Sequence, residues 1–398
     1  MTLLNIGLSV LACVFVIPLW VVSIELLITL LAKNTKGRDY NQREQPFTIL
    51  MPAHNEALII RQTLKKLIEQ SVPTADILVV ADNCSDNTAE IARNIGVQTI
   101  ERFHNEKKGK GYALDYGVAY LKKHGSHDSI IILDADCEVD YESLSIIAQR
   151  SVREHRPIQA LYLMRIPVDP TIKQRIAGFA WLVKNKLRPF AMEKLGFPIT
   201  LTGSGMAFPV DLLNQVALDH GNIVEDMQLG IDLSIMGYQP GFSSDAVVYS
   251  DFPAEADAER TQRTRWEHGH LLTIMNQVPK ILKKALTTLS LSLMALAADI
   301  AVPPLALLVI LTCIVTLCFL GLYWLGVVEQ GFYIILSSFA VFVLTLLLTW
   351  FRYGRDYITV VNLLQIPVYI LSKLGVYTGF FRQKQKDWVK TGRDNKGP

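Results

Sequence analysis

The chain has 398 residues, of which 50% are hydrophobic, and its formal net charge is only +2. This length exceeds one ordinary domain, and this hydrophobic share is high for a soluble protein and indicates membrane segments. The small net charge gives no support for a nucleic-acid partner. The five cysteines have no metal-ligand spacing, so we expect neither a disulfide framework nor a cysteine metal site.

The stretch from residue 3 to residue 32 is mostly apolar and is interrupted chiefly by Pro18 and Glu25. It is too long for the core of a signal peptide and lacks a basic start, so we predict a membrane anchor over residues 1–32. Basic residues follow it: Lys33, Lys36, Arg38 and Arg43. By the positive-inside rule, they place the next part of the chain on the cytoplasmic side.

Short apolar runs separated by polar, glycine-containing turns characterise residues 43–284, which we interpret as one cytoplasmic domain. Four runs have the length and composition of buried strands: 47–51, 77–80, 97–100 and 130–133. Helical patterns alternate with them, which predicts an α/β domain with a parallel sheet. Ligands of such sheets lie at the carboxyl ends of the strands. No motif between residues 151 and 197 indicates a function.

The fourth predicted strand ends in Asp134-Ala135-Asp136. Carboxylates at i and i+2 after a buried strand reach one edge of the sheet. Two hard oxygen ligands there suit Mg²⁺ or Mn²⁺, and such a cation suits a diphosphate. Taken alone, the pair is more typical of a turn or a helix cap. Further polar motifs along the chain favour the metal site.

Two earlier loops carry polar side chains at the same predicted edge. Asp82 follows the second strand, where it either accepts a hydrogen bond from a base or ribose or caps the next helix. For Asp86 and Thr88 we favour the cap. Lys110 lies in a basic loop with two glycines (residues 107–111), which can bring an ammonium group near phosphate but lacks the spacing of a P-loop. An isolated loop of this kind is more often a solvated turn.

Two later motifs admit both a functional and a structural interpretation. The small residues 202–205 let the backbone approach a ligand closely, or they form an ordinary turn. Glu225-Asp226 is either a catalytic pair or the acidic first turn of a helix.

A third motif, Gln262-x-x-Arg265-Trp266, precedes the membrane-proximal region. Its Arg suits a diphosphate, its Trp suits a sugar face and its Gln can hydrogen-bond. The alternative is a basic interfacial helix with an aromatic anchor. His268 and His270 follow without metal-ligand spacing, and we expect them on a polar helix surface or facing an acceptor.

Residues 285–398 form the predicted C-terminal membrane region. Residues 305–328 and 332–350 are each long enough to cross the hydrocarbon, which takes about 17–25 residues. A short acidic link joins them, and Arg352 and Arg355 follow the second one. By the positive-inside rule they form a hairpin whose acidic link lies outside the cell.

Two further apolar segments, residues 285–302 and 357–381, are interrupted by polar residues. They are either interfacial amphipathic helices or additional spans, and we favour the interfacial arrangement. With that arrangement Arg352, Arg355 and the basic tail at residues 382–393 all stay cytoplasmic.

Taken in order, these residues resemble the membrane-bound family 2 glycosyltransferases, the group that includes cellulose, chitin and hyaluronan synthases. The resemblance covers about residues 47–270 and the flanking membrane layout. The matching marks are Pro52-Ala53-His54-Asn55-Glu56, Asp82, Lys110, Asp134-Ala135-Asp136, Glu225-Asp226 and Gln262-x-x-Arg265-Trp266. One departure is Val224, which stands where many members have Thr.

The resemblance implies a GT-A fold with flanking transmembrane and interfacial helices. It also implies an inverting, metal-dependent transfer of a hexosyl or N-acetylhexosaminyl group from a nucleotide-sugar, commonly a UDP-sugar. The implied donor-binding residues are Pro52, Glu56, Asp82, Lys110, Asp134 and Arg265. The remaining implied roles are metal binding (Mg²⁺ or Mn²⁺) by Asp136, base catalysis by Asp226 with Glu225, and acceptor binding by Gln262 and Trp266.

Three functions stay open from the sequence. The favoured one is a single transfer to a lipid or lipid-linked saccharide at the cytoplasmic face of the cell's inner or plasma membrane, because three spans make a narrow bundle. The second is a processive polysaccharide synthase, acting as a homo-oligomer or with export partners, which the Gln-x-x-Arg-Trp motif favours. The third is an inactive sugar-nucleotide sensor or scaffold.

Overall fold

The computed structural model describes residues 3–32, 45–70, 72–219, 224–253 and 256–382. The basic flank from Lys33 to Arg43 and the basic tail after residue 382 lie outside these residues. Contacts along the chain divide it into two units. We call Met1–Lys33, Val168–Met192 and His270–Lys384 the helical unit. We call Asn34–Pro167, Glu193–Gly269 and Gln385–Pro398 the sheet unit.

Two segments that the sequence pattern places in the domain 43–284 belong to the helical unit in the structure. These are Val168–Met192, in the middle of that domain, and the residues from His270 onward. Within the described residues, the sheet unit therefore comes from two stretches of chain with a helical insertion between them.

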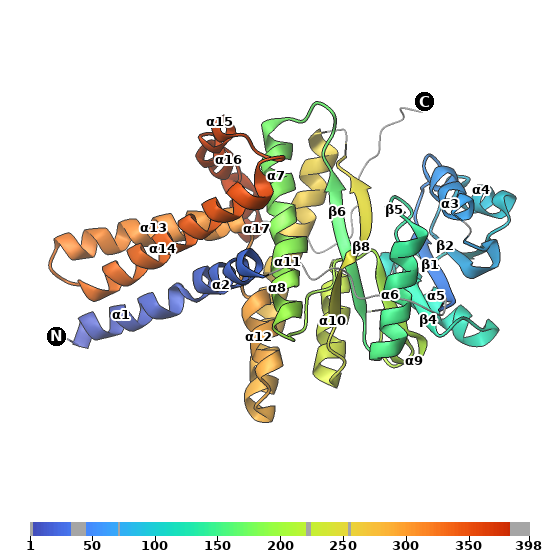
Figure 1. Cartoon of the computed structure of the whole chain (residues 1–398), viewed down its shortest axis with the longest axis horizontal. Helices are drawn as coiled ribbons and strands as arrows, with labels where there is room; N and C mark the ends of the chain where they lie inside the picture. Colours follow the sequence, from blue (N-terminus) through green and yellow to red (C-terminus); the bar gives the residue numbers. More distant parts are fainter. Residues whose placement is uncertain (1–2, 33–44, 71, 220–223, 254–255, 383–398) are drawn as a thin grey trace. The chain divides into compact units, whose positions relative to one another are not determined.

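The sheet unit is built on one eight-stranded sheet with the order β3-β2-β1-β4-β7-β6-β8-β5 (Figure 1). The strands are β1 (Phe47–Ala53), β2 (Ile77–Asp82), β3 (Gln98–Arg102), β4 (Ser129–Ile132), β5 (Glu138–Val139), β6 (Ile158–Arg165), β7 (Met206–Pro209) and β8 (Gly241–Asp251). β1, β2 and β4 are buried almost throughout, as their apolar runs predict.

The predicted parallel sheet is confirmed for the first half of the unit, because β1 pairs in parallel with β2 and β4, and β2 with β3. The later strands, which the sequence pattern did not predict, make the sheet mixed, because β7 runs antiparallel to both β4 and β6. The chain turns back into β7 after Gly203 and Gly205, whose φ angles of +96° and +68° suit glycine. β6 and β8 then pair in parallel, and β5 caps the edge antiparallel to β8.

Helices flank the sheet, and their bounds are α3 (Ile60–Glu69), η1 (Thr74–Asp76), α4 (Thr88–Ile95), α5 (Lys110–His124), α6 (Tyr141–Glu154), α9 (Val210–Leu213), α10 (Glu225–Met236) and α11 (Ala256–Thr288). α5 approaches β1 and β2 closely at Gly117, where an added Cβ would lie 2.5 Å from Leu50 Cδ1 and 2.9 Å from Val80 Cγ2. Asp140 caps α6 by accepting from the Ser143 N–H at 2.6 Å. These contacts fix the helices whose first residues line the carboxyl edge of the sheet.

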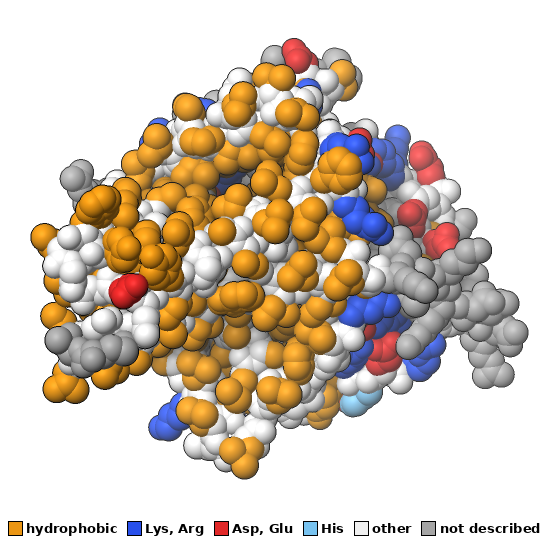
Figure 2. All heavy atoms as spheres, turned by 60° about the vertical axis from the view of Figure 1, so that its left-hand side comes forward, with side chains coloured by type: hydrophobic (Ala, Val, Ile, Leu, Met, Phe, Trp, Pro, Cys, Tyr) orange, Lys and Arg blue, Asp and Glu red, His pale blue; other side chains and the backbone are white. Residues whose placement is uncertain are grey.

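The helical unit contains α1 (Leu3–Phe15), α2 (Ile17–Leu31), α7 (Ile172–Leu182), η2 (Val183–Leu187), α8 (Arg188–Lys194), α12 (Leu291–Ile300), α13 (Leu305–Trp324), α14 (Gln330–Thr349), η3 (Trp350–Gly354), α15 (Val360–Leu363), α16 (Ile366–Ser372) and α17 (Leu374–Arg382). In the described part of the chain, three helices are long and apolar enough to cross a membrane: Leu3–Leu31, Leu305–Trp324 and Gln330–Gly354. They match the three predicted spans. Figure 2 shows hydrophobic side chains spread over the outer face of these helices, where Leu11, Leu317 and Leu344 are more than half exposed.

The two ambiguous apolar segments form short helices. α12 has ten residues, and α15, α16 and α17 have four, seven and nine. A helix needs about 17 residues to cross the hydrocarbon, so none of them is long enough to span it alone. This agrees with the favoured interfacial arrangement, which itself remains a prediction.

The insertion that contains α7 and α8 is held inside the helical unit by buried charge. Arg188 donates to Glu25 Oε2 from Nε and to Asp299 Oδ1 from Nη2, both at 2.5 Å. Glu25 and Arg188 are less than 10% exposed. Removing one partner of such a buried group leaves an uncompensated charge, so the triad holds α2, α8 and α12 in one arrangement.

Candidate active site

The loop after β4 carries the Asp-x-Asp pair to the carboxyl edge of the sheet. Possible ligand atoms of Asp134, Asp136 and Cys137 lie within 4.8 Å of one another. Burial and the nearby carboxylates raise the pKa of the Cys137 thiol well above its usual range, so the thiol stays neutral. The donors that fit a hard divalent cation here are therefore the two carboxylates.

Lys110 begins α5 and reaches across to this loop. Its Nζ lies 2.5 Å from Asp134 Oδ1 and donates to the Gly203 carbonyl at 2.7 Å. Burial works to lower the pKa of Lys110, but the carboxylates of Asp134, Glu225 and Asp226 outweigh it and raise the pKa. The ammonium group therefore stays charged and is bound to Asp134 at the Asp-x-Asp loop.

The small-residue loop 202–205 packs its backbone against the same groups. A Cβ added to Gly203 would lie 3.3 Å from Asp226 Oδ2 and 3.6 Å from Lys110 Nζ. Ser204 Oγ accepts from the Asp134 N–H at 3.1 Å. The sequence predicted that the backbone of this loop approaches a ligand closely or forms an ordinary turn. In the structure this backbone lies close to the charged side chains of Lys110 and Asp226.

Glu225 and Asp226 occupy the first turn of α10. A helix N-terminus stabilises anions, yet the pKa of Glu225 is raised to about 7. Burial is the main cause, the charge of Asp226 adds to it, and Lys110 opposes it. The pair is both the acidic first turn of a helix and part of the charged site, since Lys110, Glu225 and Asp226 line one small cavity.

Arg265 lies on α11, on the helix face that also carries Gln262, Trp266 and Gly269 at i, i+3, i+4 and i+7 spacing. Gly269 brings α11 against the start of α10, because an added Cβ would lie 2.7 Å from Val224 Cγ1. Burial lowers the pKa of Arg265, while four carboxylates act in the opposite direction. These four are Glu225, Asp134, Asp226 and Asp136.

The site therefore gathers four carboxylates around two cations, Lys110 and Arg265. With all six groups ionised its net charge is −2. Asp134 shows the effect of this excess: burial and the neighbouring Asp136 raise its pKa in spite of the bonded Lys110. A divalent cation would balance the charge.

Two family models cover most of this chain. The model described as glycosyl transferase family group 2 matches residues 129–372, and the one described as glycosyl transferase family 2 matches residues 48–208. The chain belongs to glycosyltransferase family 2.

Curated relatives are named as a glycosyltransferase or a polysaccharide synthase. The glycosyltransferase is 25% identical over 254 residues to the probable glycosyltransferase YdaM of Bacillus subtilis, covering 61% of this chain and 60% of that one. It is 23% identical over 256 residues to the poly-beta-1,6-N-acetyl-D-glucosamine synthase of Staphylococcus epidermidis, covering 62% and 60%. The chain thus spans about 60% of the length of these relatives.

Among solved structures, the mannosyltransferase PcManGT from Pyrobaculum calidifontis, in complex with GDP-Man and Mn²⁺, has a TM-score of 0.53 and 16% identity. The match covers 87% of this glycosyltransferase and 99% of that chain. It supports the GT-A type fold expected from the sequence.

The glycosyltransferase places Asp82 at the end of β2 in a buried ion pair. Arg102 Nη1 donates to Asp82 Oδ1 at 2.6 Å, and the two residues are register partners in β2 and β3. Sequence reasoning did not identify Arg102, although strand order places it opposite Asp82. Asp82 therefore presents its carboxylate together with a guanidinium.

Pro52 and Glu56 lie at the end of β1 and in the loop that follows it. Pro52 is within β1, and the Glu56 N–H donates to Thr88 Oγ1 at 2.7 Å. The cap interpretation is confirmed for Asp86, which accepts from the Thr88 N–H at the start of α4 at 3.0 Å. The donor-binding roles of Pro52 and Glu56 stay predictions.

The polar-surface alternative for His268 and His270 is wrong, because these side chains are 3% and 9% exposed. α11 is enclosed on this side, and His270 Nε2 lies 3.1 Å from the Ile300 carbonyl. Burial and the nearby Lys184 lower the pKa of His270 to about 3, so the ring is neutral. Gln262 and Trp266 are half-buried, and their acceptor roles stay predictions.

Proposed function

We propose that the protein is an inverting, metal-dependent glycosyltransferase that moves a sugar from a nucleotide-sugar to a lipid or lipid-linked saccharide. The donor is expected to be a UDP-sugar, and the transfer to occur at the cytoplasmic face of the membrane. The observation that carries the proposal is the cluster of four carboxylates with Lys110 and Arg265. Its net negative charge suits a divalent cation, and Arg265 suits a diphosphate.

The donor half of the site is formed by Lys110, Asp134 and Arg265, with Asp82 and Arg102 beside the nucleoside. Arg265 is always charged and can bind a diphosphate through two parallel hydrogen bonds. Pro52 at the end of β1 and Glu56 in the loop after it complete this half. Together these groups stabilise the leaving nucleoside diphosphate.

The cation would be held by Asp136, the second carboxylate of the loop after β4, next to the Asp134–Lys110 ion pair. When bound, Mg²⁺ or Mn²⁺ would neutralise charge on the leaving diphosphate. The fit rests on two hard carboxylates at one loop and on the net negative charge around them.

Asp226 would deprotonate the acceptor hydroxyl, as one general base suffices for an inverting transfer. The pKa of Glu225, about 7, lets this neighbour carry a proton for part of the time at neutral pH. That arrangement limits the repulsion between two adjacent carboxylates and separates their roles. Gln262 and Trp266 on α11 would then contact the acceptor.

The membrane orientation rests on the hairpin of α13 and α14. Aromatic side chains cluster where the two helices join, with Tyr323 and Phe332 rings 5.1 Å apart and Tyr323 near Tyr333. Arg352 and Arg355 follow α14 at the opposite end of the hairpin. Aromatic belts mark membrane interfaces and basic residues mark the cytoplasmic side, which supports a cytoplasmic catalytic domain.

A processive polysaccharide synthase is the second candidate. It is supported by the curated relatives named poly-beta-1,6-N-acetyl-D-glucosamine synthase and by the Gln262-x-x-Arg265-Trp266 motif. With three candidate spans among the described residues, such a synthase would need a homo-oligomer or an export partner to pass a polymer.

The deciding experiment is turnover of UDP-N-acetylglucosamine, other UDP-sugars and GDP-mannose by the purified full chain in native lipid with Mg²⁺ or Mn²⁺. Masses are measured in the organic and aqueous phases. One sugar added to a lipid supports the proposal, and a ladder of oligomers supports the synthase. Donor binding without turnover, in wild type and Asp226→Asn alike, would instead indicate a sensor.

A further inference from the structure

Gln159 lies in β6, within the stretch where the sequence shows no functional motif. Its side chain is 2% exposed and reaches from β6 to the loop 202–205. Its Oε1 accepts from the Thr202 N–H at 2.9 Å, and its Nε2 donates to the Ser204 carbonyl at 2.8 Å. One carboxamide thus binds the backbone on both sides of Gly203.

That loop in turn holds two of the charged groups of the site. The Gly203 carbonyl accepts from Lys110 Nζ at 2.7 Å, and Ser204 Oγ accepts from the Asp134 N–H at 3.1 Å. Gln159 is therefore one hydrogen-bonded step away from both members of the Lys110–Asp134 ion pair.

Strand pairing anchors only the far end of the loop. The Gly205 N–H donates to the Ile132 carbonyl at 2.9 Å, and its carbonyl accepts from the Ala160 N–H at 2.8 Å. The positive φ of Gly203 lets the backbone bend toward Asp226, and Gly203 itself has no side chain to hold it there. The Gln159 carboxamide supplies the fixed contacts at Thr202 and Ser204.

We infer that Gln159 is a positioning residue for sugar transfer, acting through the loop 202–205 on Lys110 and Asp134. The inference rests on the proposed function, because it concerns the same site. Glutamine suits the position since its carboxamide donates and accepts at once. A glutamate there can accept from Thr202 but, when ionised, cannot donate to the Ser204 carbonyl.

The test compares Gln159→Met, which keeps the length but removes both hydrogen bonds, with wild type in the full chain. Outer contacts that orient ligands of a metal site are typically worth about 10–100-fold in affinity or activity. We expect Gln159→Met to raise the Mn²⁺ concentration for half-activation and the donor KM by about tenfold. Mn²⁺ affinity, read by electron paramagnetic resonance with Mn²⁺ alone, should weaken in parallel.

The matched control is Gln174→Met, which removes a buried glutamine that caps α7 in the helical unit. It should lower the melting temperature without changing the donor KM or the Mn²⁺ affinity. If Gln159→Met does not fold, Gln159→Glu has nearly the same shape and should give the same shifts.

Unchanged donor KM and Mn²⁺ affinity in an active, folded Gln159 variant would overturn the inference while the proposed function stands. A fall in kcat alone, together with a lower melting temperature, would overturn it too and assign Gln159 a structural role. A wild-type protein that transfers no sugar from any donor would instead contradict the proposed function.

Discussion

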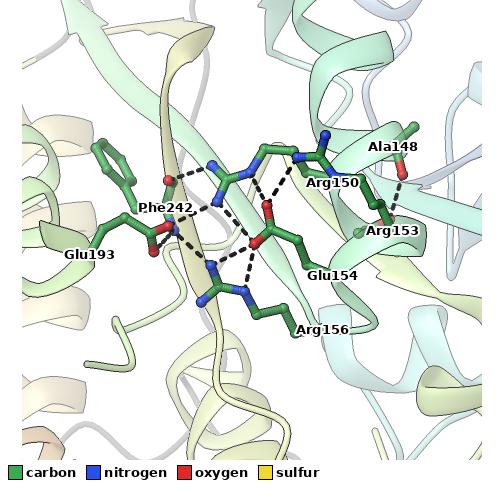
Figure 3. Close-up of polar contacts among 8 residues, drawn as sticks. Ala148, Arg150, Arg153, Glu154, Arg156, Glu193 and Phe242 are labelled. Atoms are coloured by element: carbon green, nitrogen blue, oxygen red, sulfur yellow. Dashed lines mark hydrogen bonds and ion pairs between the residues drawn. The ribbon is translucent and has the colours of Figure 1, made fainter. Parts of the chain in front are cut away.

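Two clusters of charge in the sheet unit are built from the same residue types but differ in balance. In the first, Arg150 and Arg156 join Glu154 and Glu193 between α6, the end of α8 and the start of β8 (Figure 3). In the second, at the carboxyl edge of the sheet, four carboxylates meet two cations.

The balanced cluster satisfies each of its members. Arg150 donates to Glu154, to Glu193 and to the Phe242 carbonyl, and Glu193 Oε2 accepts from the Phe242 N–H (Figure 3). Although burial works to raise the pKa of Glu154, hydrogen bonds from the arginines prevail and lower it to about 2. This cluster contributes stability and needs no further ion.

In the unbalanced cluster the carboxylate pKa values shift in the opposite direction. The pKa of Glu225 rises to about 7, and that of Asp134 is raised as well. Buried carboxylates in excess are costly to the folded protein and are retained where a ligand supplies the missing charge. These two clusters thus differ in charge balance, although both contain ion pairs.

The largest effect is expected from Asp136→Ala. This change removes the carboxylate proposed to hold the cation, so metal-dependent transfer should be abolished. Activity is measured with increasing Mn²⁺ and again in a strong chelator. Full wild-type activity in the chelator would refute the metal assignment.

Asp226→Asn is expected to lower kcat by about 10²–10⁴-fold, the usual contribution of a general base. The side chain keeps its shape, so the melting temperature should change little. Measuring kcat under saturating donor and acceptor checks this. A kcat within a few-fold of wild type would assign the base to another residue.

Gly269→Ala changes no charge but should displace α11, and with it Arg265, because its Cβ would lie 2.7 Å from Val224 Cγ1. We expect kcat to fall by about tenfold or more, as small misplacements of reacting groups are costly. Adding Val224→Ala makes room for the methyl group and should restore activity. If the single variant is as active as wild type, the α10–α11 contact does not set the position of Arg265.

Breaking the balanced cluster should affect stability and leave catalysis intact. Arg150→Met removes one partner of a buried network and should destabilise the fold by about 3 kcal/mol. Arg153→Met is the control, since Arg153 is largely exposed and reaches the same Glu154 only at 3.4 Å. Thermal unfolding and kcat of the folded protein are measured for both variants. Equal melting temperatures for Arg150→Met and Arg153→Met would contradict the larger stabilising role given to Arg150.

A pH-dependent gain in stability is expected for Glu225→Gln. Because the folded-state pKa of Glu225 is raised from 4.5 to about 7, its ionisation disfavours folding. That penalty is absent below about pH 4.5, grows as the pH rises and is complete above about pH 7. The variant should therefore melt at a higher temperature than wild type at pH 8, with a smaller difference at pH 5.5. The same difference at both pH values would contradict the raised pKa.

The sequence predicted those parts of the fold that depend on local pattern. Apolar runs located β1, β2 and β4, and the end of the last run placed Asp134 and Asp136 at the sheet edge. Residues whose partners are distant in the chain could not be found this way. Arg188 meets Glu25 across 163 positions, and Gln159 meets Thr202 across 43.

Some misassignments share the same physical origin. His268 and His270 look like surface residues from their polar neighbours, and only tertiary packing encloses them. The insertion that contains Arg188 carries no motif because its role is to pack within the helical unit. The raised pKa of Glu225 likewise follows from Asp226, Lys110 and burial acting together.

The most direct test of the account is calorimetric titration of Mn²⁺ into the purified full chain in the presence of UDP, with wild type, Asp136→Ala and Arg150→Met compared at one pH. The unbalanced cluster predicts one bound ion per chain in wild type, retained in Arg150→Met and lost in Asp136→Ala. Equal Mn²⁺ binding by wild type and Asp136→Ala would contradict the claim that the excess carboxylates at the sheet edge form the cation site.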